Sequence, residues 1–252
     1  MLKSIEIKGF RGFGENRVLN LAVPDGINKG SGLTTLVGAN NSGKTSIIEC
    51  IKYYRFDPDN ISFSTGKRNI KTNKRVKITY TDIKNESYTI KTLEGKGSQV
   101  ESNRENISDN TKIPYILPSR RHVNYAFHGN ANSISHRWDY LNNEYMNSRT
   151  RKPTIDNFQE RIFKWSNNKK EFDKILYKII DRELEWYIDL NDDNSYYLAF
   201  SVGGKVSHTS EGLGDGIWSI FTIVDALYDS KEGSIIVIDE PELSLHPQYQ
   251  RK

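Results

Sequence analysis

One octapeptide, GANNSGKT at Gly38–Thr45, constrains the fold of this chain more than any other segment. It has the spacing GxxxxGK[ST] of a phosphate-binding loop. It lies between an apolar segment, Leu33–Val37, and a stretch whose isoleucines share one side of a helix. A loop of this kind needs a strand before it and a helix N-terminus after it, because the free N–H groups and partial positive charge there attract anions. The motif therefore predicts an α/β fold with a strand at Leu33–Val37 and a helix from about Lys44.

The residues of this loop divide into backbone and side-chain roles. Gly38 and Gly43 allow backbone angles that a Cβ atom would oppose, so that successive N–H groups can point at phosphate oxygens. Lys44 would reach the β- and γ-phosphates, which makes it a candidate catalytic residue, and Thr45 would offer its hydroxyl to Mg²⁺. The predicted nucleotide contacts in this loop are Gly38, Asn40, Asn41, Ser42, Gly43, Lys44, Thr45 and Ser46.

A second motif, SIIVIDEPE at Ser234–Glu242, follows far downstream. The apolar run Ile235–Ile238 is typical of a strand that is covered on both faces of a parallel sheet. Asp239 and Glu240 stand at its C-terminal end, where open α/β sheets place ligands. We assign Asp239 to the metal and Glu240 to the orientation or deprotonation of the attacking water. The alternative is that two adjacent acids are only a solvated strand end.

The sequence favours ATP over GTP as the nucleotide. A guanine site would need the pattern Asn-Lys-x-Asp, and neither of the two Asn-Lys pairs, at Asn28 and Asn73, is followed by that aspartate. A P-loop kinase is a further alternative. It would need a pocket for the substrate phosphate and a lid, and it leaves the next motif unexplained.

A glycine-rich segment with Ser210, Gly212, Gly214 and Gly216 precedes the amphipathic stretch Ile217–Leu227. A serine hydroxyl, free N–H groups and a helix N-terminus make a second anion site. One chain does not need two γ-phosphate sites in one place. We therefore expect Ser210 and Gly212 to face the nucleotide of another subunit, with an ordinary glycine-rich helix cap as the alternative.

In this order the motifs resemble those of ABC-type ATPase heads of the SMC, RecF and overcoming-lysogenization-defect (OLD) group, which are AAA-type P-loop ATPases. KSIEIKGFRGFGE looks like the first strand of these heads, with Phe10 and Arg11 in the usual aromatic and basic places. GANNSGKT matches their Walker A motif, and TSEGLGDG looks like a shortened form of their Ser-x-Gly signature. IIVIDEPELSLHP is similar to the Walker B motif and following loop of the OLD-like members.

This resemblance implies how the motifs work together. ATP would be sandwiched between two heads, with Lys44 and Thr45 of one head facing Ser210 and Gly212 of the other. Glu240 would be the general base of hydrolysis. The implied cofactors are ATP and Mg²⁺, and the implied assembly is a homodimer or higher homo-oligomer joined through ATP-bridged heads.

The sequence departs from the family pattern in several places. No glutamine is a convincing Q-loop residue, and Thr209 stands where the signature usually has leucine. Family heads continue beyond the point that corresponds to Lys252 with a strand that lies between the two Walker strands. We therefore expect that residues 1–252 alone are not a complete folding unit, and a nuclease domain could follow. His246 comes too early for the switch histidine and is assigned to the Leu-His-Pro turn.

The predicted fold is an α/β P-loop NTPase core sheet of the ABC-ATPase type, with an antiparallel β portion and a small helical signature lobe. The core lobe is assigned to residues 1–125 and 200–252, and the helical lobe to about 126–216. Helices are expected within residues 133–181, and a mobile loop is expected over Gly95–Thr111. Further strands are predicted at Lys3–Lys8, Arg17–Val23, Val76–Tyr80, Tyr88–Thr92, Tyr115–Leu117, Leu184–Leu190 and Tyr196–Phe200.

Composition adds weaker limits. A net charge of +4 on 252 residues is a mild basic bias, which permits contact with nucleic acid but does not demand it. The single Cys50 cannot form an internal disulfide and no run is long enough to span a bilayer, so we expect a cytoplasmic protein without membrane contact. Most basic clusters are expected to be solvated surface. Arg120 and Arg121 are the exceptions and could reach the nucleotide or the dimer interface, and Arg11 could approach the base or ribose.

Two functions remain open from the sequence. The first is an ATP-hydrolysing, dimerising switch that acts in DNA repair or anti-phage defence, with DNA as a partner. The second is a sensor or scaffold in which ATP holds and releases an effector protein with slow turnover. The two differ in what stimulates turnover and in what co-purifies with the chain.

Overall fold

The computed structural model describes most of residues 1–252 in two compact units. The described residues are 1–54, 61–71, 75–94, 97–103, 114–119, 126–127, 169–181, 184–190, 196–202, 207–209, 214–228, 233–243 and 245–251. The first unit comprises Met1–Pro114 and Gly233–Ile235. The second comprises Tyr115–Glu232 and Ile236–Lys252. The lobe boundaries expected from the sequence stay a prediction.

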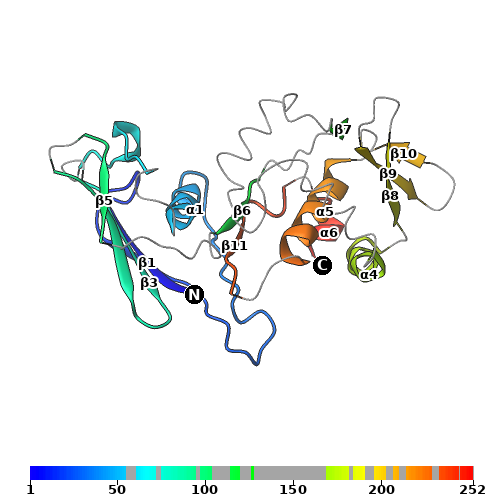
Figure 1. The fold of residues 1–252 in the computed structure, drawn as a ribbon, viewed down its shortest axis with the longest axis horizontal. Helices are drawn as coiled ribbons and strands as arrows, with labels where there is room; N and C mark the ends of the chain where they lie inside the picture. The colour runs from blue at the N-terminus through cyan, green and yellow to red at the C-terminus, as the bar shows by residue number, and fades with distance from the viewer. Residues whose placement is uncertain are drawn as a thin grey trace. The chain divides into compact units, whose positions relative to one another are not determined.

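An antiparallel sheet forms the body of the first unit (Figure 1). Its strands run in the order β2-β1-β3-β4-β5. The three central strands β1, β3 and β4 carry buried isoleucine or tyrosine at alternate positions, as expected of a sheet with one covered face. Asn85, with φ 62°, makes the β3–β4 turn that its Lys-Asn-Glu context predicts. The bounds are β1 Leu2–Lys8, β2 Arg17–Asn20, β3 Lys77–Asp82, β4 Ser87–Thr92 and β5 Val100–Ser102.

Helix α1, Lys44–Tyr53, packs on the buried face of this sheet. Its residues Ile48, Cys50 and Ile51 are buried. The hydroxyl of Tyr80, on β3, donates to the carbonyl oxygen of Cys50 over 2.6 Å. A short 3-10 helix, η2, covers Thr65–Lys67. The sheet and α1 therefore form one core, which fixes the direction in which the phosphate loop enters the helix.

The strand predicted at Leu33–Val37 is not present in the structure. This segment pairs with no strand of the described residues, and the side chains of Leu33 and Val37 are 74% and 90% exposed. The segment does contain apolar residues, but a β-strand also needs an adjacent strand with which its backbone can form hydrogen bonds. That neighbour is missing from the described part of the first unit.

In the second unit, strand β11, Ile236–Ile238, pairs in parallel with β6, Tyr115–Leu117. Helix α5, Asp215–Tyr228, lies against this pair, where Ala226 and Ile223 pack with Tyr115, Leu117 and the β11 isoleucines. The β11 side chains are half-buried, so the sequence prediction of a strand with both faces fully covered is only partly met.

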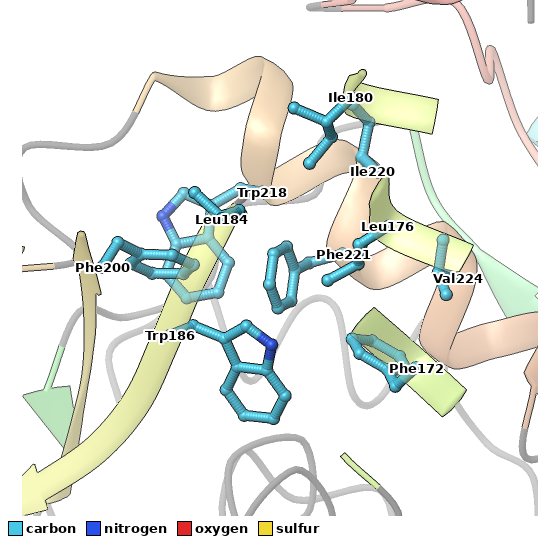
Figure 2. Close-up of a cluster of buried hydrophobic side chains, with 10 residues drawn as sticks. All are labelled: Phe172, Leu176, Ile180, Leu184, Trp186, Phe200, Trp218, Ile220, Phe221 and Val224. Carbon is cyan, nitrogen blue, oxygen red and sulfur yellow. The ribbon is translucent and has the colours of Figure 1, made fainter. Parts of the chain in front are cut away.

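The opposite side of α5 enters a larger core. Figure 2 shows Phe221 of α5 directed between Trp186 and Phe200, with ring centroids 5.9 Å and 5.3 Å apart. Phe172 and Leu176 of α4 complete this core. The surrounding elements are α4 Lys169–Ile180, β7 Ala126–Phe127, β8 Leu184–Leu190, β9 Tyr196–Val202 and β10 Ser207–Thr209. Strands β7, β8 and β10 all pair antiparallel with β9.

Within the described residues, most strands predicted from the sequence occur within one to three residues of their expected ends. The helices expected over residues 133–181 are described only from Lys169 onward, and the remainder lies outside the described residues. No helix of the described residues has the length and apolar character needed to cross a membrane.

Candidate functional site

The phosphate loop leaves its preceding segment and enters α1 through two residues in left-handed conformation. Asn41 has φ 64° and Gly43, the N-cap of α1, has φ 99°. The first helical bond runs from the N–H of Ile47 to the carbonyl oxygen of Gly43, over 3.0 Å. Residues 38–42 are exposed, so their backbone faces solvent at the start of the helix. This is the geometry of an anion site at a helix N-terminus.

Lys44 folds back over this loop. Its ammonium donates to the carbonyl oxygens of Gly38 and Ala39, over 2.6 Å and 2.9 Å. The side chain therefore bridges the first and last parts of the motif. Thr45 is exposed, as a metal-binding hydroxyl would need to be. Ser46 is only 7% exposed, so its side chain points inward and its predicted contact is left to its backbone.

The two glycines of the motif have distinct reasons to lack a Cβ atom. At Gly38 a Cβ would lie 2.5 Å from Oγ of Ser42. At Gly43 a Cβ would lie 3.0 Å from Cζ of Phe13, and the positive φ already disfavours any side chain. Glycine at these two positions therefore permits the close approach of Ser42 and Phe13 to the loop backbone. The position of the loop at a helix N-terminus suits a nucleotide phosphate group.

A cavity of about 590 Å³ adjoins the loop in the same unit. Phe13, which touches the Gly43 position, lines it together with Ile47 of α1. Its walls combine these apolar side chains with the cations Arg17 and Lys71, the carboxylate of Glu15 and the amide of Asn69. Apolar walls with a few polar groups are typical of small-molecule sites. This cavity was missed by sequence reasoning, and its only sequence signal was the aromatic residue in Phe-Arg-Gly-Phe.

Arg11 does not point into that cavity as a free cation. Its guanidinium Nη2 lies 2.5 Å from Oε2 of Glu49, on α1. The interpretation that Arg11 approaches the base or ribose therefore stays a prediction, whereas its pairing with Glu49 is an observation. Nothing in the sequence pattern indicated this pair.

The carboxylate motif lies in the second unit, directly after β11. The N–H of Asp239 donates to the carbonyl oxygen of Leu117 over 2.9 Å, which extends the parallel pairing by one residue. Glu240 then adopts φ 44°, and its carbonyl oxygen accepts from the N–H of Leu243 over 3.0 Å. A left-handed glutamate is strained, and strain of this kind clusters at functional turns. Glu240 is exposed in this turn.

Helix α5 contacts this turn directly. The hydroxyl of Ser219, which is 2% exposed, donates to the carbonyl oxygen of Leu243 over 3.4 Å. Beyond the turn, His246 caps α6, Pro247–Gln250, by accepting from the N–H of Gln248 at Nδ1 over 3.3 Å. This agrees with the assignment of His246 to a turn.

Several predicted residues lie outside the described part of the chain. They are Ser210, Gly212, Arg120 and Arg121. The phosphate loop and the carboxylates belong to different units, so their joint site stays a prediction. Within the described residues, no group of three or more His, Cys, Asp or Glu side chains is arranged to hold a metal ion.

Comparison with known proteins decides the family. The family model described as "AAA domain, putative AbiEii toxin, Type IV TA system" matches residues 33–252, which is most of the chain. The chain belongs to this AAA family. Among curated protein sequences, none matches the chain.

Solved structures show the fold of the AAA domain. An SMC head bound to the C-winged helix domain of ScpA is similar with a TM-score of 0.52 at 12% identity, over 99% of this chain and 91% of that one. The SMC head domain from Thermotoga maritima has a TM-score of 0.41 at 14% identity, over 99% and 91%. The first likeness confirms the predicted α/β P-loop fold of the ABC and SMC type. The AAA domain is thus a member of a nucleotide-binding ATPase family with an SMC-like head fold.

Proposed function

We propose that this AAA domain binds ATP with Mg²⁺ and hydrolyses it. The observation that carries the proposal is the phosphate loop, in which the Lys44 ammonium bridges the carbonyl oxygens of Gly38 and Ala39 at the N-terminus of α1. A triphosphate entering the loop would replace the carbonyl oxygens of Gly38 and Ala39 as the partners of the Lys44 ammonium. Charge-assisted hydrogen bonds to phosphate are stronger than those to neutral carbonyls, so the exchange favours binding.

The base and ribose of the nucleotide are assigned to the cavity beside the loop. Phe13 and Ile47 offer apolar surface to the base, and Asn69 offers an amide to its polar edge. Because the cavity and the loop share the Phe13–Gly43 contact, one ligand can span both. This assignment is supported by the size of the cavity, about 590 Å³, which suits a nucleoside.

Hydrolysis is assigned to the carboxylate turn. Glu240 would take a proton from the attacking water, and its exposed, left-handed position at the end of β11 supports this role. Asp239 and the hydroxyl of Thr45 would hold Mg²⁺, which supplies positive charge to the phosphate oxygens. The proposal requires that the two units bring these residues to the same phosphate group.

We further propose that two AAA domains pair through ATP, with Ser210 and Gly212 of one facing the nucleotide of the other. Pairing would make the domain an ATP-driven switch in DNA repair or anti-phage defence. The alternative is a scaffold that holds and releases an effector protein with slow turnover. The family description, which names a toxin of a Type IV TA system, and the SMC head solved with a ScpA domain both support a protein partner.

Calorimetry with ATP and Mg²⁺ tests the central claim. Lys44→Ala should abolish tight ATP binding, because it removes the ammonium that lies against Gly38 and Ala39 at the start of the loop. Lys91→Ala is the matched control, since Lys91 is an exposed lysine of the same unit that pairs with Glu101. Equal ATP affinity in the wild type and Lys44→Ala would rule out the phosphate-loop assignment.

A further inference from the structure

Glu49 is the centre of a partly buried charge cluster on α1. Its side chain is 17% exposed and lies 2.5 Å from Nη2 of Arg11 and 3.0 Å from Nζ of Lys67. The Tyr53 hydroxyl donates to the same carboxylate over 2.7 Å and accepts from Lys67 over 3.0 Å. One carboxylate therefore neutralises two cations that come from two different loops.

An aromatic floor supports this cluster. The rings of Phe10, Tyr53 and Phe63 meet edge to face, with centroid separations of 5.7 Å to 6.4 Å. Burial, together with the neighbouring Glu49, raises the pKa of Tyr53 well above its usual value, so its hydroxyl keeps its proton and stays a donor. Glu49 is the least exposed of the three charged side chains, at 17% against 37% for Arg11 and 35% for Lys67, so the loss of its charge affects both cations while solvent screens part of each pair.

The turn that carries Arg11 is strained. Arg11 has φ 46°, a left-handed conformation that a non-glycine residue adopts only when its surroundings hold it there. The N–H of Arg11 donates to the carbonyl oxygen of Lys67 over 2.8 Å, and the N–H of Phe13 donates to that of Phe10 over 2.8 Å. The Glu49 carboxylate supplies the only side-chain charge opposite Arg11 in the described residues.

The same turn also touches the phosphate loop. Phe13 Cζ lies 3.0 Å from where a Cβ of Gly43 would be, and Gly43 is the N-cap of α1. The turn is thus fastened to one helix at two points, at Gly43 through Phe13 and at Glu49 through Arg11. These points are six residues apart, which is about 9 Å along a helix at about 1.5 Å per residue.

We propose that Glu49 is a positioning residue, which holds the Phe10–Phe13 turn in its strained form and thereby keeps Phe13 against the phosphate loop. The effect of Glu49 on ATP binding rests on the proposed function, whereas its effect on the Phe10–Phe13 turn does not. Without the carboxylate, Arg11 and Lys67 repel each other. Within the described residues, the left-handed backbone of Arg11 is then held only by its hydrogen bonds to Lys67 and to the amide of Asn69. The turn then relaxes, Phe13 withdraws from Gly43, and the loop loses one wall.

Hydrogen exchange without nucleotide tests the positioning role independently of ATP. In Glu49→Gln, the amides of Arg11 and Phe13, and that of Ile47 in the first turn of α1, should exchange about tenfold faster than in the wild type. Glu101→Gln is the control, because Glu101 forms a 2.7 Å ion pair with Lys91 in the same unit, far from the turn in the chain. It should leave all three amides unchanged.

The link to the nucleotide is tested by steady-state kinetics. Glu49→Gln should raise the KM for ATP about tenfold with kcat within twofold. Arg11→Gly in the Glu49→Gln background should recover most of the loss, since glycine adopts φ 46° without support. If Glu49→Gln instead raised the KM by a general loss of stability, Arg11→Gly would not lower the KM again.

The outcomes separate this inference from the proposed function. Unchanged exchange in Glu49→Gln, or a double variant no better than the single one, overturns the positioning role. Faster exchange with an unchanged KM overturns its link to the nucleotide. If the wild type binds no ATP while Ile47 still exchanges faster in Glu49→Gln, the proposed function fails and the positioning role stands.

Discussion

The buried hydroxyl of Ser219 on α5 donates to the carbonyl oxygen of Leu243, in the turn that begins at Glu240. The helix that follows the glycine-rich signature is therefore bonded to the turn that carries the candidate base. A shift of α5 would therefore displace this turn through the hydrogen bond between Ser219 and Leu243. Such a bond offers a route by which subunit pairing at the signature could reach the carboxylates.

Ser219→Ala is expected to weaken this connection without opening the core. The bond is long at 3.4 Å, so its loss should lower the free energy of unfolding by no more than ~1 kcal/mol. Turnover should fall more than ATP affinity, because Ser219 touches the carboxylate turn and not the phosphate loop. Denaturation and steady-state kinetics measure the two effects. A change in ATP affinity alone would contradict this reading.

Gly43→Ala should damage the phosphate loop. At φ 99° an alanine is strained by about 1–3 kcal/mol, and its Cβ would also press on Phe13 at 3.0 Å. We expect lower stability and loss of tight ATP binding by calorimetry. Gly66→Ala is the control, since no atom lies within 4 Å of its added Cβ. That variant should gain up to ~1 kcal/mol or change little.

Glu240→Gln is expected to separate binding from hydrolysis. The amide keeps the size of the side chain and removes the base, so ATP should still bind while turnover falls by ~10²–10⁴-fold. The variant should accumulate as ATP-bound pairs, which sedimentation can detect. Near-normal hydrolysis would remove Glu240 from the role of base.

Pairing in trans is tested by mixing two inactive variants. Ser210→Arg should bind ATP as a single chain but lose pairing and turnover, whereas Lys44→Ala should lose binding. In a mixed dimer one composite site carries both changes and the other carries neither, so some activity should return on mixing. Normal hydrolysis by Ser210→Arg as a monomer would leave the glycine-rich segment as only a helix cap.

Alkaline pH should destabilise the first unit. Burial raises the pKa of the Cys50 thiol and of the Tyr80 phenol well above their usual values. Both groups are neutral when protonated, and they ionise at lower pH in the unfolded chain. Their contribution to stability is therefore complete below pH ~8.5 and is lost as pH rises, by up to ~1.4 kcal/mol per pH unit and group.

Cys50→Ala isolates the share of the thiol in this effect. Urea denaturation between pH 7 and 10 should give a shallower loss of stability for the variant than for the wild type above pH ~8.5. Parallel curves would show that the Cys50 thiol titrates alike in the folded and unfolded chain. Alkylation of the thiol at pH 8 should likewise require unfolding.

The local patterns of the sequence were sufficient for much of the fold. Alternation predicts β1, β3 and β4 because one face of their sheet is covered, and the apolar spacing of α5 predicts a helix that is buried along much of its length. The same reasoning failed at Leu33–Val37, since a strand depends on a partner that no local pattern reports.

The candidate site was predictable where residue type and spacing are themselves the chemistry. The positive φ of Gly43 and the start of α1 at Lys44 follow from the phosphate-loop motif. The contact of Lys44 with phosphate stays a prediction. The role of Glu49 does not, because an acid on a helix normally indicates a solvated face. Its partners Arg11 and Lys67 come from distant loops, which only tertiary structure brings to it.

Helix α5 belongs to two hydrophobic cores at once. Trp218 and Phe221 are packed among α4, β8 and β9, while Ala226 is packed with Tyr115 and Leu117 of β6. If either core opened to water, the buried side chains on one side of α5 would become exposed. The second unit should therefore melt in a single cooperative step, and its slowest-exchanging amides should lie in α5. A change that loosens β11 would then also speed amide hydrogen exchange in α4, β8 and β9, because α5 packs against both groups of elements.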